Sequence, residues 1–532
     1  MAESLRFLPA GSNAILVEVD DLATTLTLLD GLRVHRPEGT VDLVPAARTL
    51  LVRFDPLLAD RAELIEIISR IDLSVRSKRQ GETFEIPVAY DGEDLNEVAD
   101  ILGWTVYELI RRHTEATFTV AFTGFAPGFA YMTCDDPAFD VPRRKSPRVR
   151  IPAGSVALAG KFSGVYPSDS PGGWQLLGRT PLKMWETTRP RAALLGPGDR
   201  VRFRDMSAKE ISIPVPAAPE LKTEGVRTAG LLVTRSGSPA LYQDLGRPGR
   251  ADQGVSESGA LDRCSLMQAN LCVGNRREAA TIEIAFGGFA LKADRPVTLG
   301  VTGAPAPIVI RTADGRSLSA PFGRPFALDA GDELVLGPQP EGVHSYLALR
   351  GGFDVEAILG SASTDTLAKV GPAPIMAGDI LVPANEPTTA VDPFQTTSKR
   401  LPKAGDTVTL DVVLGPRTDW FTQQGVQALL GRDWQVTAES SRVGMRLAGA
   451  QPLERRDAAE LPSEGIALGA IQVPHNGQPV LFLADHPLTG GYPVIGVVAR
   501  HHLDLAGQIP IGASIRFNAI AAFDPLIRKT HG

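Results

Sequence analysis

The chain has 532 residues, a net charge of -7 and 43% hydrophobic residues, which indicates a soluble globular protein of about three or four domains. It has no long basic stripe, so nucleic acid and an anionic membrane are not expected partners. Its three cysteines form no CxxC pair and no apolar run is long enough to span a membrane. We therefore expect no disulfide scaffold, metal site or membrane span, and a cytoplasmic location.

The first 82 residues combine strands with two amphipathic helices. Strands are predicted near 5–8, 14–19, 40–44 and 48–54, and helices around 22–29 and 64–71, the first capped at Asp20-Asp21. A strand at Phe84–Ala89, at the border of the next unit, completes a β-α-β-β-α-β order. This order is typical of a ferredoxin-like domain, which we assign to residues 1–82.

A repeated β unit follows. An apolar strand opened by glycine occurs at 154–158 and again at 469–473, and a Gly-Gly-aromatic turn follows each, at 172–174 and 490–492. Each copy closes on a similar strand, at 198–203 and 512–517. The segment 331–337, with Gly351-Gly352 after it, resembles a weaker third copy. One β unit is thus used at least twice, which predicts a tandem β architecture.

Composition divides the rest of the chain. A β unit is expected at 83–206, and the Pro-, Ala- and Glu-containing segment 207–224 is predicted to be a linker. Two further β units follow, at 225–400 and 401–532, and the first contains a helical stretch at 264–273.

Glycine-rich turns are the first candidate binding features. In Gly124–Tyr131, two glycines and three aromatics occur where the backbone must bend sharply. Glycine lets peptide N–H groups approach a bound oxyanion, so Gly124 and Gly128 are candidate binding residues. The alternative is a tight hairpin whose aromatics belong to the core.

Further polar candidates lie in the second half of the chain. Asp244 and Arg247, beside Gln243, form either part of a binding site or a surface ion pair. Asp262 and Asn270 are about two helical turns apart, so they either face one pocket or are a helix cap and a solvent-facing residue.

The last β unit adds charged residues next to its glycine turn. Arg442 and Arg446 have a spacing suited to clamping an anion, although solvated arginines fit equally well. Asp485 offers an acid or base before the turn Thr489–Tyr492. The pair His501-His502 is assigned to a solvated loop, and residues 154–161 fail as a P-loop because their glycine spacing is too long.

Together these stretches resemble a known family. Residues 1–205 are similar to the B subunit of bacterial 5-oxoprolinase, also called allophanate hydrolase subunit 1. Residues 225–525 are similar to the C subunit of the same enzyme, also called allophanate hydrolase subunit 2. The matching motifs are GFAPGFAY (124–131), IPAGSVALAG (151–160), SPGGWQLLGRTP (170–181), YQDLGRPGRADQGVSESGALDRCSLMQANLCVGN (242–275), SSRVGMRL (440–447), GAIQVPHNGQPV (469–480) and TGGYP (489–493). The chain therefore resembles a fusion of these B and C subunits, related also to the carboxyltransferase domain of urea carboxylase.

The resemblance implies a mainly β fold with an α+β N-terminal part, a ferredoxin-like domain followed by tandem cyclophilin-like β-barrels. It also implies ATP-dependent opening of 5-oxo-L-proline to L-glutamate with a separate A subunit, ATP and Mg²⁺ as cofactors, and a composite site between the two halves. Self-association is left open. No biotin attachment site is present.

The same resemblance suggests roles for individual residues. Asp262, Asn270 and Asp485 would orient the ring or move protons, and Arg442 and Arg446 would meet phosphate charge. The glycine turns would give peptide N–H donors to the oxyanion. The remaining substrate-binding candidates are Gly154, Ser155, Gly172, Gly173, Gln243, Asp244, Arg247, Gln472, Thr489, Gly490, Gly491 and Tyr492.

Three departures from the family motifs, at Ser441, Asp365 and residues 486–488, leave the substrate open. One alternative is a carboxyltransferase component that acts on urea or a related amide. Another is a non-catalytic regulator of a sensor histidine kinase. The two differ in whether the purified protein turns over a small molecule.

Overall fold

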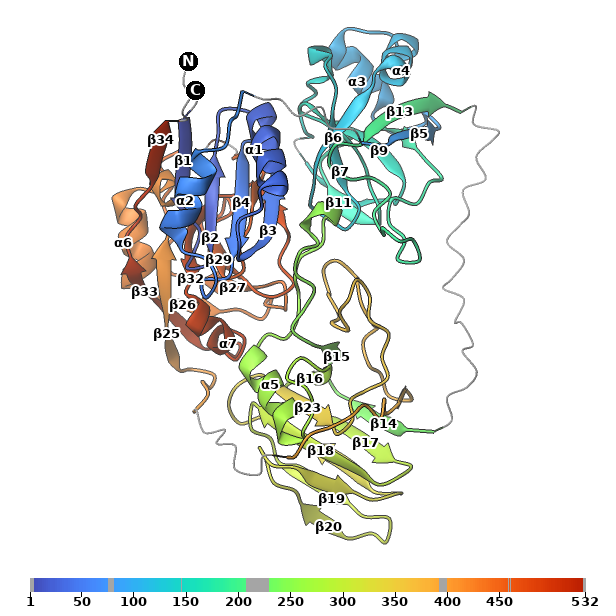
Figure 1. The fold of residues 1–532 in the computed structure, drawn as a ribbon, viewed down its shortest axis with the longest axis vertical. Helices are drawn as coiled ribbons and strands as arrows, with labels where there is room; N and C mark the ends of the chain where they lie inside the picture. The colour runs from blue at the N-terminus through green and yellow to red at the C-terminus, as the bar shows by residue number, and fades with distance from the viewer. Residues whose placement is uncertain are drawn as a thin grey trace.

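The computed structural model describes residues 4–74, 81–144, 146–206, 229–391, 400–457, 459 and 461–529. The predicted linker 207–224 lies outside these residues. Figure 1 shows three lobes, in which the first and last parts of the chain pack together, residues 81–206 form a second lobe and residues 229–391 form a third. Within the described residues, no helix is both long and apolar enough to cross a membrane.

The N-terminal sheet unit is a five-stranded sheet with two helices on one face. Its strand order is β3-β4-β2-β1-β34, so the C-terminal strand pairs with the first strand. Asp21 caps α1 as predicted, accepting a hydrogen bond of 2.8 Å from the Thr24 N–H. The elements are β1 (Ser4–Pro9), β2 (Ala14–Glu18), α1 (Leu22–Val34), β3 (Thr40–Pro45), β4 (Thr49–Phe54), α2 (Arg61–Ser69) and β34 (Leu526–Lys529).

The prediction that a strand at 84–89 completes this sheet is wrong. That strand, β5 (Thr83–Val88), pairs in parallel with β13 (Arg200–Asp205) in the next unit. In the predicted order, the closing strand would lie beside β2. In the structure β1 takes that position, because it forms a hairpin with β2. Adjacent strands joined by a short turn pair first, so the hairpin leaves no vacancy beside β2.

The first barrel, residues 81–206, is a seven-stranded sheet that curls until its ends nearly meet. The strand order is β12-β9-β10-β7-β6-β13-β5, and a bridge from Ala89 to Arg179 links the two edge strands. Its elements are α3 (Leu95–Leu102), α4 (Val106–Glu115), β6 (Phe118–Thr123), β7 (Ala130–Thr133), η1 (Pro137–Phe139), β8 (Arg148–Ile151), β9 (Ser155–Ala159), β10 (Phe162–Val165), β11 (Ser170–Gly172) and β12 (Gln175–Arg179).

The last barrel, residues 400–521, closes fully in the order β25-β32-β29-β30-β27-β26-β33. Read around the ring, this is the order of the first barrel, and the parallel pair β5–β13 corresponds to the parallel pair β25–β33. The predicted duplication is therefore confirmed. The elements are β25 (Thr407–Leu414), η3 (Thr418–Trp420), α6 (Gln423–Gly431), β26 (Asp433–Val436), β27 (Gly444–Ala448), β28 (Glu464–Gly465), β29 (Ala470–Gln472), β30 (Val480–Phe482), β31 (Thr489–Gly490), β32 (Val494–Val498), η4 (Arg500–His502), α7 (Leu503–Ala506) and β33 (Ser514–Ala521).

The middle unit, residues 229–391, encloses its core between two antiparallel sheets, ordered β20-β19-β22-β17-β14-β24 and β15-β16-β23-β18-β21. Its strand order differs from that of the other two barrels, although the predicted helix at 264–273 is confirmed as α5. The elements are β14 (Leu231–Ser236), β15 (Ala240–Gln243), η2 (Ala251–Gln253), α5 (Arg263–Cys272), β16 (Thr281–Ala285), β17 (Phe289–Ala293), β18 (Val297–Gly303), β19 (Ile308–Arg311), β20 (Ser317–Ser319), β21 (Phe326–Leu328), β22 (Glu333–Leu336), β23 (His344–Leu349) and β24 (Ile380–Leu381).

The N-terminal sheet packs its second face on the last barrel. Leu16 and Leu51 share a buried apolar cluster with Phe482 and Val497. Burial of both sheet faces explains why β2 and β4 read as nearly continuous apolar runs. This packing brings the two chain termini to the same sheet and holds the last barrel against the N-terminal sheet unit.

Candidate functional site

Three units meet along a contact region that we call the seam, formed by residues 123–129 of the first barrel, 251–259 of the middle unit and 485–489 of the last barrel. The Thr123 hydroxyl donates to the Ala251 carbonyl at 2.8 Å, and the Gly128 N–H donates to the Gln253 carbonyl at 2.9 Å. A Cβ at Gly124 would lie 2.5 Å from the Thr489 hydroxyl. Glycine at 124 is therefore needed for close approach of the two barrels.

Four of the six non-glycine residues with positive φ in the described part of the chain lie at the seam or in the segment 359–371. Phe125 and Ser258 have positive φ angles of 65° and 55°. Leu359 and Lys369, at the two ends of the segment 359–371, have φ angles of 56° and 54°. Non-glycine residues in this region of φ cost about 1–3 kcal/mol each and cluster at functional sites. The strain marks the seam and the neighbouring 359–371 segment as the candidate site.

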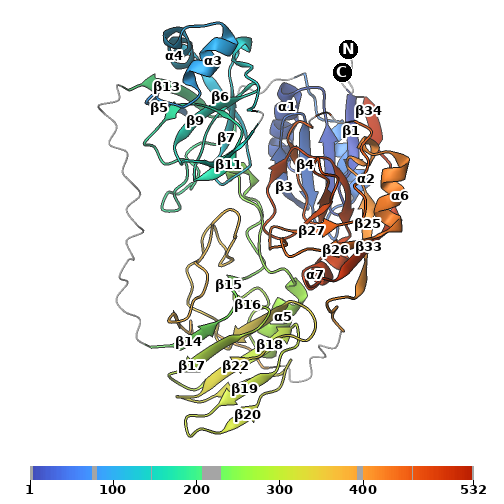
Figure 2. The same ribbon diagram turned by 180° about the vertical axis from the view of Figure 1, so that it is seen from behind.

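The segment 359–371 projects from the middle unit toward the first barrel, as both ribbon views show (Figure 2). Hydrogen bonds from the Ala153 N–H and Arg150 chiefly lower the pKa of Asp169 in the first barrel, and the charge of Lys369 adds to the effect. Asp244 holds the start of the segment, accepting hydrogen bonds from the Ser361 hydroxyl (2.6 Å) and the Ala362 N–H (2.7 Å).

Asp485, predicted as an acid or base, is fully buried and saturated with hydrogen bonds. It accepts from Arg442 at 3.0 and 3.1 Å, from the Ser258 hydroxyl at 2.7 Å, and from the Thr366 N–H and hydroxyl at 2.9 and 2.7 Å. Burial opposes ionisation of Asp485, but Arg442 outweighs it and lowers its pKa. A carboxylate in this state ties three segments together rather than exchanging protons.

Arg442 bridges the last barrel and the middle unit. Its guanidinium pairs with Asp485 and with Glu283 of β16, and donates to the Gly259 carbonyl at 2.6 Å. Burial favours loss of the proton, yet the two carboxylates raise the pKa of Arg442. Arg446, by contrast, lies on the exposed side of β27 and its side chain is 57% exposed. The predicted anion clamp of two arginines is therefore wrong, because Arg442 is already neutralised and Arg446 faces away from it.

Arg247 differs from Arg417 and Arg442, the other buried arginines that the structure describes, because it lacks a full set of partners. Its side chain donates one hydrogen bond, from Nη2 to the Ser363 carbonyl, while Nε and Nη1 have no protein partner. Gln243 donates from Nε2 to the carbonyl of Thr364, the residue after Ser363, at 2.8 Å, and its Oε1 is likewise unpaired. Buried polar groups are nearly always hydrogen-bonded, so two orphan donors and one orphan acceptor on side chains bonded to neighbouring carbonyls indicate a ligand or ordered water.

Asp365 faces the same cluster. It accepts from the Leu367 and Ala368 N–H groups at 3.0 and 2.8 Å and from the Ser256 hydroxyl at 3.1 Å. Burial, followed by the charge of Asp485, raises the pKa of Asp365 to about 6. The sequence marked this position as a departure from the family motif but did not identify it as a site residue. Its only signal was a carboxylate directly after the segment Gly360–Thr364.

Asp262 and Asn270 do not share a pocket. Asp262 caps α5 through the Ser265 N–H at 2.9 Å and accepts from Gln508 at 2.8 Å, and burial raises its pKa to about 6. Asn270 donates to the Ala279 carbonyl at 2.7 Å at the other end of the helix. The alternative interpretation of Asp262 as a helix cap is confirmed, while Asn270 is buried rather than solvent-facing.

Four of the peptide N–H groups predicted as oxyanion donors are already used within the protein. The N–H groups of Gly124, Gly128, Gly154 and Ser155 each donate to a backbone carbonyl. In the first barrel the aromatics fill the space instead, and a Cβ at Gly172 would lie 2.4 Å from the Tyr166 hydroxyl. The expected oxyanion donors are therefore wrong at these four positions, because the N–H groups are already used in backbone hydrogen bonds.

The remaining candidates, among them Gln472, Gly173 and Gly491, lie in or beside the Gly-Gly-aromatic turns. Gln472 donates to the Tyr492 carbonyl at 3.1 Å and would lie 2.8 Å from a Cβ at Gly490. Gly173 and Gly491 border their turns, where a Cβ would meet only nearby loop atoms. Gln472 thus fixes the Thr489–Tyr492 turn, whose Thr489 contacts the first barrel.

The predicted phosphate-binding residues do not fit Mg²⁺-ATP. Residues 154–161 form β9 and its hairpin with β10 rather than a loop before a helix, so they offer no phosphate cradle. Arg442 is ion-paired and Arg446 lies on a solvent-facing strand, so neither converges on a phosphate position. The cluster around Arg247 instead combines guanidinium donors, an amide acceptor and a carboxyl group, a set suited to a small amide-type molecule.

The fold and the seam define a protein of tandem β-barrels with a composite polar site between them. Comparisons with known proteins agree. The carboxyltransferase domain, subdomain A and B, matches residues 253–519, and the carboxyltransferase domain, subdomain C and D, matches residues 5–195. The chain belongs to this carboxyltransferase-domain family, with both domains fused in one chain.

Its relatives match one half each. The C subunit of 5-oxoprolinase from Escherichia coli K12 is 33% identical over 290 residues, which is 54% of this chain and 90% of that protein. The B subunit of 5-oxoprolinase from Escherichia coli O157:H7 is 43% identical over 206 residues, 36% of this chain and 92% of that protein. Urea amidolyase of Saccharomyces cerevisiae is 31% identical over 304 residues, but the match spans only 16% of that enzyme.

A solved structure covers both halves at once. The crystal structure of TTHA0988 has a TM-score of 0.80 and 33% sequence identity, covering 95% of this chain and 99% of that one. The arrangement of the fused halves described above is thus shared with another protein of the family.

Proposed function

We propose that this chain supplies the B-like and C-like parts of an ATP-dependent 5-oxoprolinase, which opens 5-oxo-L-proline to L-glutamate together with a separate A subunit. The matches to the B and C subunits of 5-oxoprolinase over 92% and 90% of their lengths support this assignment. Fusion of both matches in one chain fits a composite site that needs both halves.

The observation that carries the proposal is the orphan pair Arg247 and Gln243. A lactam presents one carbonyl oxygen that accepts hydrogen bonds and one N–H that donates. The free Nε and Nη1 donors of Arg247 match the carbonyl, and the free Oε1 of Gln243 matches the N–H. Such matched buried groups reject molecules that lack the amide, because the orphans would then stay unpaired.

Asp365 is the group we assign to proton movement. Hydrolysis of the lactam adds a water oxygen to the carbonyl carbon and breaks the C–N bond, and the departing nitrogen takes up a proton. A carboxyl group with a pKa of about 6 exchanges protons near neutral pH. Asp485, which the sequence suggested for this role, is assigned instead to holding Ser258, Thr366 and Arg442 in place.

ATP and Mg²⁺ are assigned to the A subunit. Neither the 154–161 hairpin nor the arginines at 442 and 446 fit a triphosphate, so we derive no step through the nucleotide on this chain. A cytoplasmic location and self-association remain predictions from the sequence.

Access to Arg247 requires movement. The residue is 2% exposed, and two cavities of about 730 and 400 Å³ lie away from it, between α1 and the first barrel and at the edge of β14. The 359–371 segment covers the guanidinium through Ser363 and has glycines with positive φ at 360 and 371. We assign substrate entry to displacement of this segment.

The test mixes the purified chain with an A-type subunit, 5-oxo-L-proline, Mg²⁺ and ATP, and measures L-glutamate and ADP. Both products are expected in equal amounts, and neither when either protein is left out. ADP release that is independent of 5-oxo-L-proline, with no glutamate, would rule the proposal out.

A second candidate is a carboxyltransferase component that acts on urea. The match to urea amidolyase favours it, and urea offers the same carbonyl and N–H groups to Arg247 and Gln243. It predicts turnover of urea with a carboxylated biotin carrier and no glutamate production in the assay above. Regulation of a sensor histidine kinase has no support among the relatives described.

A further inference from the structure

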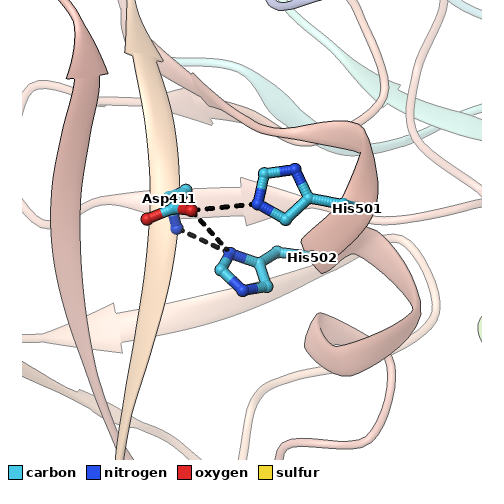
Figure 3. A group of neighbouring side chains, drawn as sticks. All are labelled: Asp411, His501 and His502. Carbon is cyan, nitrogen blue, oxygen red and sulfur yellow. Dashed lines mark hydrogen bonds and ion pairs between the residues drawn. The ribbon is translucent and has the colours of Figure 1, made fainter.

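Two histidines and an aspartate from distant parts of the chain meet on the surface of the last barrel. Asp411 lies on β25, and His501 and His502 form the end of η4. Both rings turn toward the Asp411 carboxylate (Figure 3). Sequence analysis assigned the two histidines to a solvated loop, because nothing in the sequence indicates that residue 411 lies opposite them.

The spacing of the three groups is that of ligands around one small ion. The Asp411 Oδ2 atom lies 2.9 Å from His501 Nε2 and 3.7 Å from His502 Nδ1, and the three ligand atoms all fall within 4.8 Å of one another. Ligands at about 2.0–2.2 Å from a tetrahedral ion are themselves roughly 3.3–3.5 Å apart. The observed distances of 2.9 and 3.7 Å lie below and above this range.

Neighbouring groups orient the ligands. The Asn518 side chain donates to Asp411 Oδ1 at 2.7 Å, which directs Oδ2 toward the histidines. The Asp411 N–H donates to His502 Nδ1 at 2.8 Å, so this nitrogen is unprotonated and its lone pair points at the Asp411 backbone. The Ala499 N–H donates to the Asp411 carbonyl at 2.8 Å and fixes η4 to β25. Ligands held by rigid elements lose little freedom when an ion binds.

We propose that Asp411, His501 and His502 bind one divalent first-row transition ion of the Zn²⁺ type. Two imidazoles and one carboxylate suit such ions rather than Mg²⁺ or Ca²⁺, which prefer oxygen ligands. Binding displaces the proton that His501 shares with Asp411, and it competes with the Asp411 N–H for His502 Nδ1. With three protein ligands, a water molecule completes the coordination.

The position of the site assigns it a structural role. Directly after His502, the chain continues into α7, and Asp504 accepts the Arg263 N–H of the middle unit at 2.9 Å. Gln508, further along, accepts from the His344 N–H at 2.9 Å. On the other side, Arg500 pairs with Asp55 of the N-terminal sheet unit at 3.6 Å. An ion that fixes η4 to β25 therefore stabilises the segment that joins the last barrel to both other units.

The test uses tag-free, chelator-treated protein and Zn²⁺ as the probe. Titration calorimetry is expected to show one site with micromolar affinity, and Zn²⁺ is expected to raise the melting temperature by several degrees. Co²⁺ bound at the same site is expected to give the visible absorption of a four-coordinate ion. All three signals should vanish in His501→Ala, whose native side chain is 57% exposed.

Two further variants complete the design. Asn518→Ala should weaken Zn²⁺ binding by about tenfold, because it removes the group that orients Asp411. His35→Ala, at an exposed histidine of the first lobe, should leave binding unchanged. Absence of Zn²⁺ binding, or binding that is equal in wild type and His501→Ala, overturns the proposal. Binding without a change in melting temperature overturns its structural role.

Discussion

The two matching barrels differ in what their corresponding loops carry. Between β6 and β7 the first barrel has Phe125 and Phe129, and between β26 and β27 the last barrel has Arg442. After β10 the first barrel has Tyr166, and after β30 the last barrel has Asp485. The same strand order thus presents an aromatic cluster in one copy and a buried ion network in the other.

The Gly-Gly-aromatic turn shows the same difference within one motif. Trp174 is buried, with its ring centroid 5.3 Å from that of Phe129, whereas Tyr492 is 38% exposed. The first barrel therefore uses its loops for packing and the last barrel uses them to organise charge next to the middle unit. Function lies in the loops rather than in the shared fold.

The largest expected effect comes from removing the charge that organises the last barrel. Arg442→Met leaves Glu283 and Asp485 buried without their cation, and we expect a loss of about 3–5 kcal/mol in the free energy of unfolding. Urea denaturation measures it. Arg446→Met, four residues along on the exposed side of β27, is the matched control and should change stability by about 0.5 kcal/mol or less. Equal effects at 442 and 446 would contradict the comparison.

A smaller effect is expected where the first barrel touches the last. Gly124→Ala places a Cβ 2.5 Å from the Thr489 hydroxyl and should cost about 1–3 kcal/mol. Adding Thr489→Ala should recover most of that loss, since it removes the two closest atoms. Gly431→Ala at the end of α6, where a Cβ meets no atom within 4 Å, is the control and should be neutral or slightly stabilising. No recovery in the double variant would show that the contact is not what constrains Gly124.

The smallest expected effect is a dependence of stability on pH, which arises in the charged network between the last barrel and the middle unit. The pKa of Asp365 is raised to about 6 in the folded state, above its value in the unfolded chain. The folded state therefore holds this proton more tightly. The stability it contributes is present at about pH 4 and is lost as pH rises through about 6.

Asp365→Asn should remove the loss of stability that accompanies the rise in pH. Between pH 4 and 7.5 the wild type should lose of the order of 1–3 kcal/mol relative to the variant, because one pKa unit corresponds to about 1.4 kcal/mol. Asp262, whose pKa is also raised to about 6, contributes equally to both proteins. Denaturation midpoints measured at several pH values test this, and parallel pH profiles for the two proteins would count against it.

Much of the fold could be predicted because it depends on local periodicity and on repetition. The alternating residues of 154–158 and 469–473 and the glycines after them identified two copies with the same strand order. The strand at 84–89 was assigned to the wrong sheet, since β5 pairs with β13 more than 100 residues later and the sequence carries no signal for that partner. The pairing of β34 with β1 is equally nonlocal.

The site was less predictable because burial and pairing decide which charges are available. Arg247 and Arg442 look alike in the sequence, yet Arg442 is neutralised by two carboxylates and Arg247 keeps two free donors. Asp485 lies at the predicted place but is saturated. The Asp411, His501 and His502 cluster was missed because its members are about 90 residues apart in sequence.

The central claim is that Arg247, not the ion-paired Arg442, meets the substrate amide. The most direct measurement compares Arg247→Met with wild type in the coupled assay with an A-type subunit, and measures the free energy of unfolding of both. We predict that kcat/KM for 5-oxo-L-proline falls by about 100-fold or more while stability does not fall, because two of the three guanidinium nitrogens have no protein partner to lose. Unchanged kcat/KM in a folded Arg247→Met protein would contradict the account.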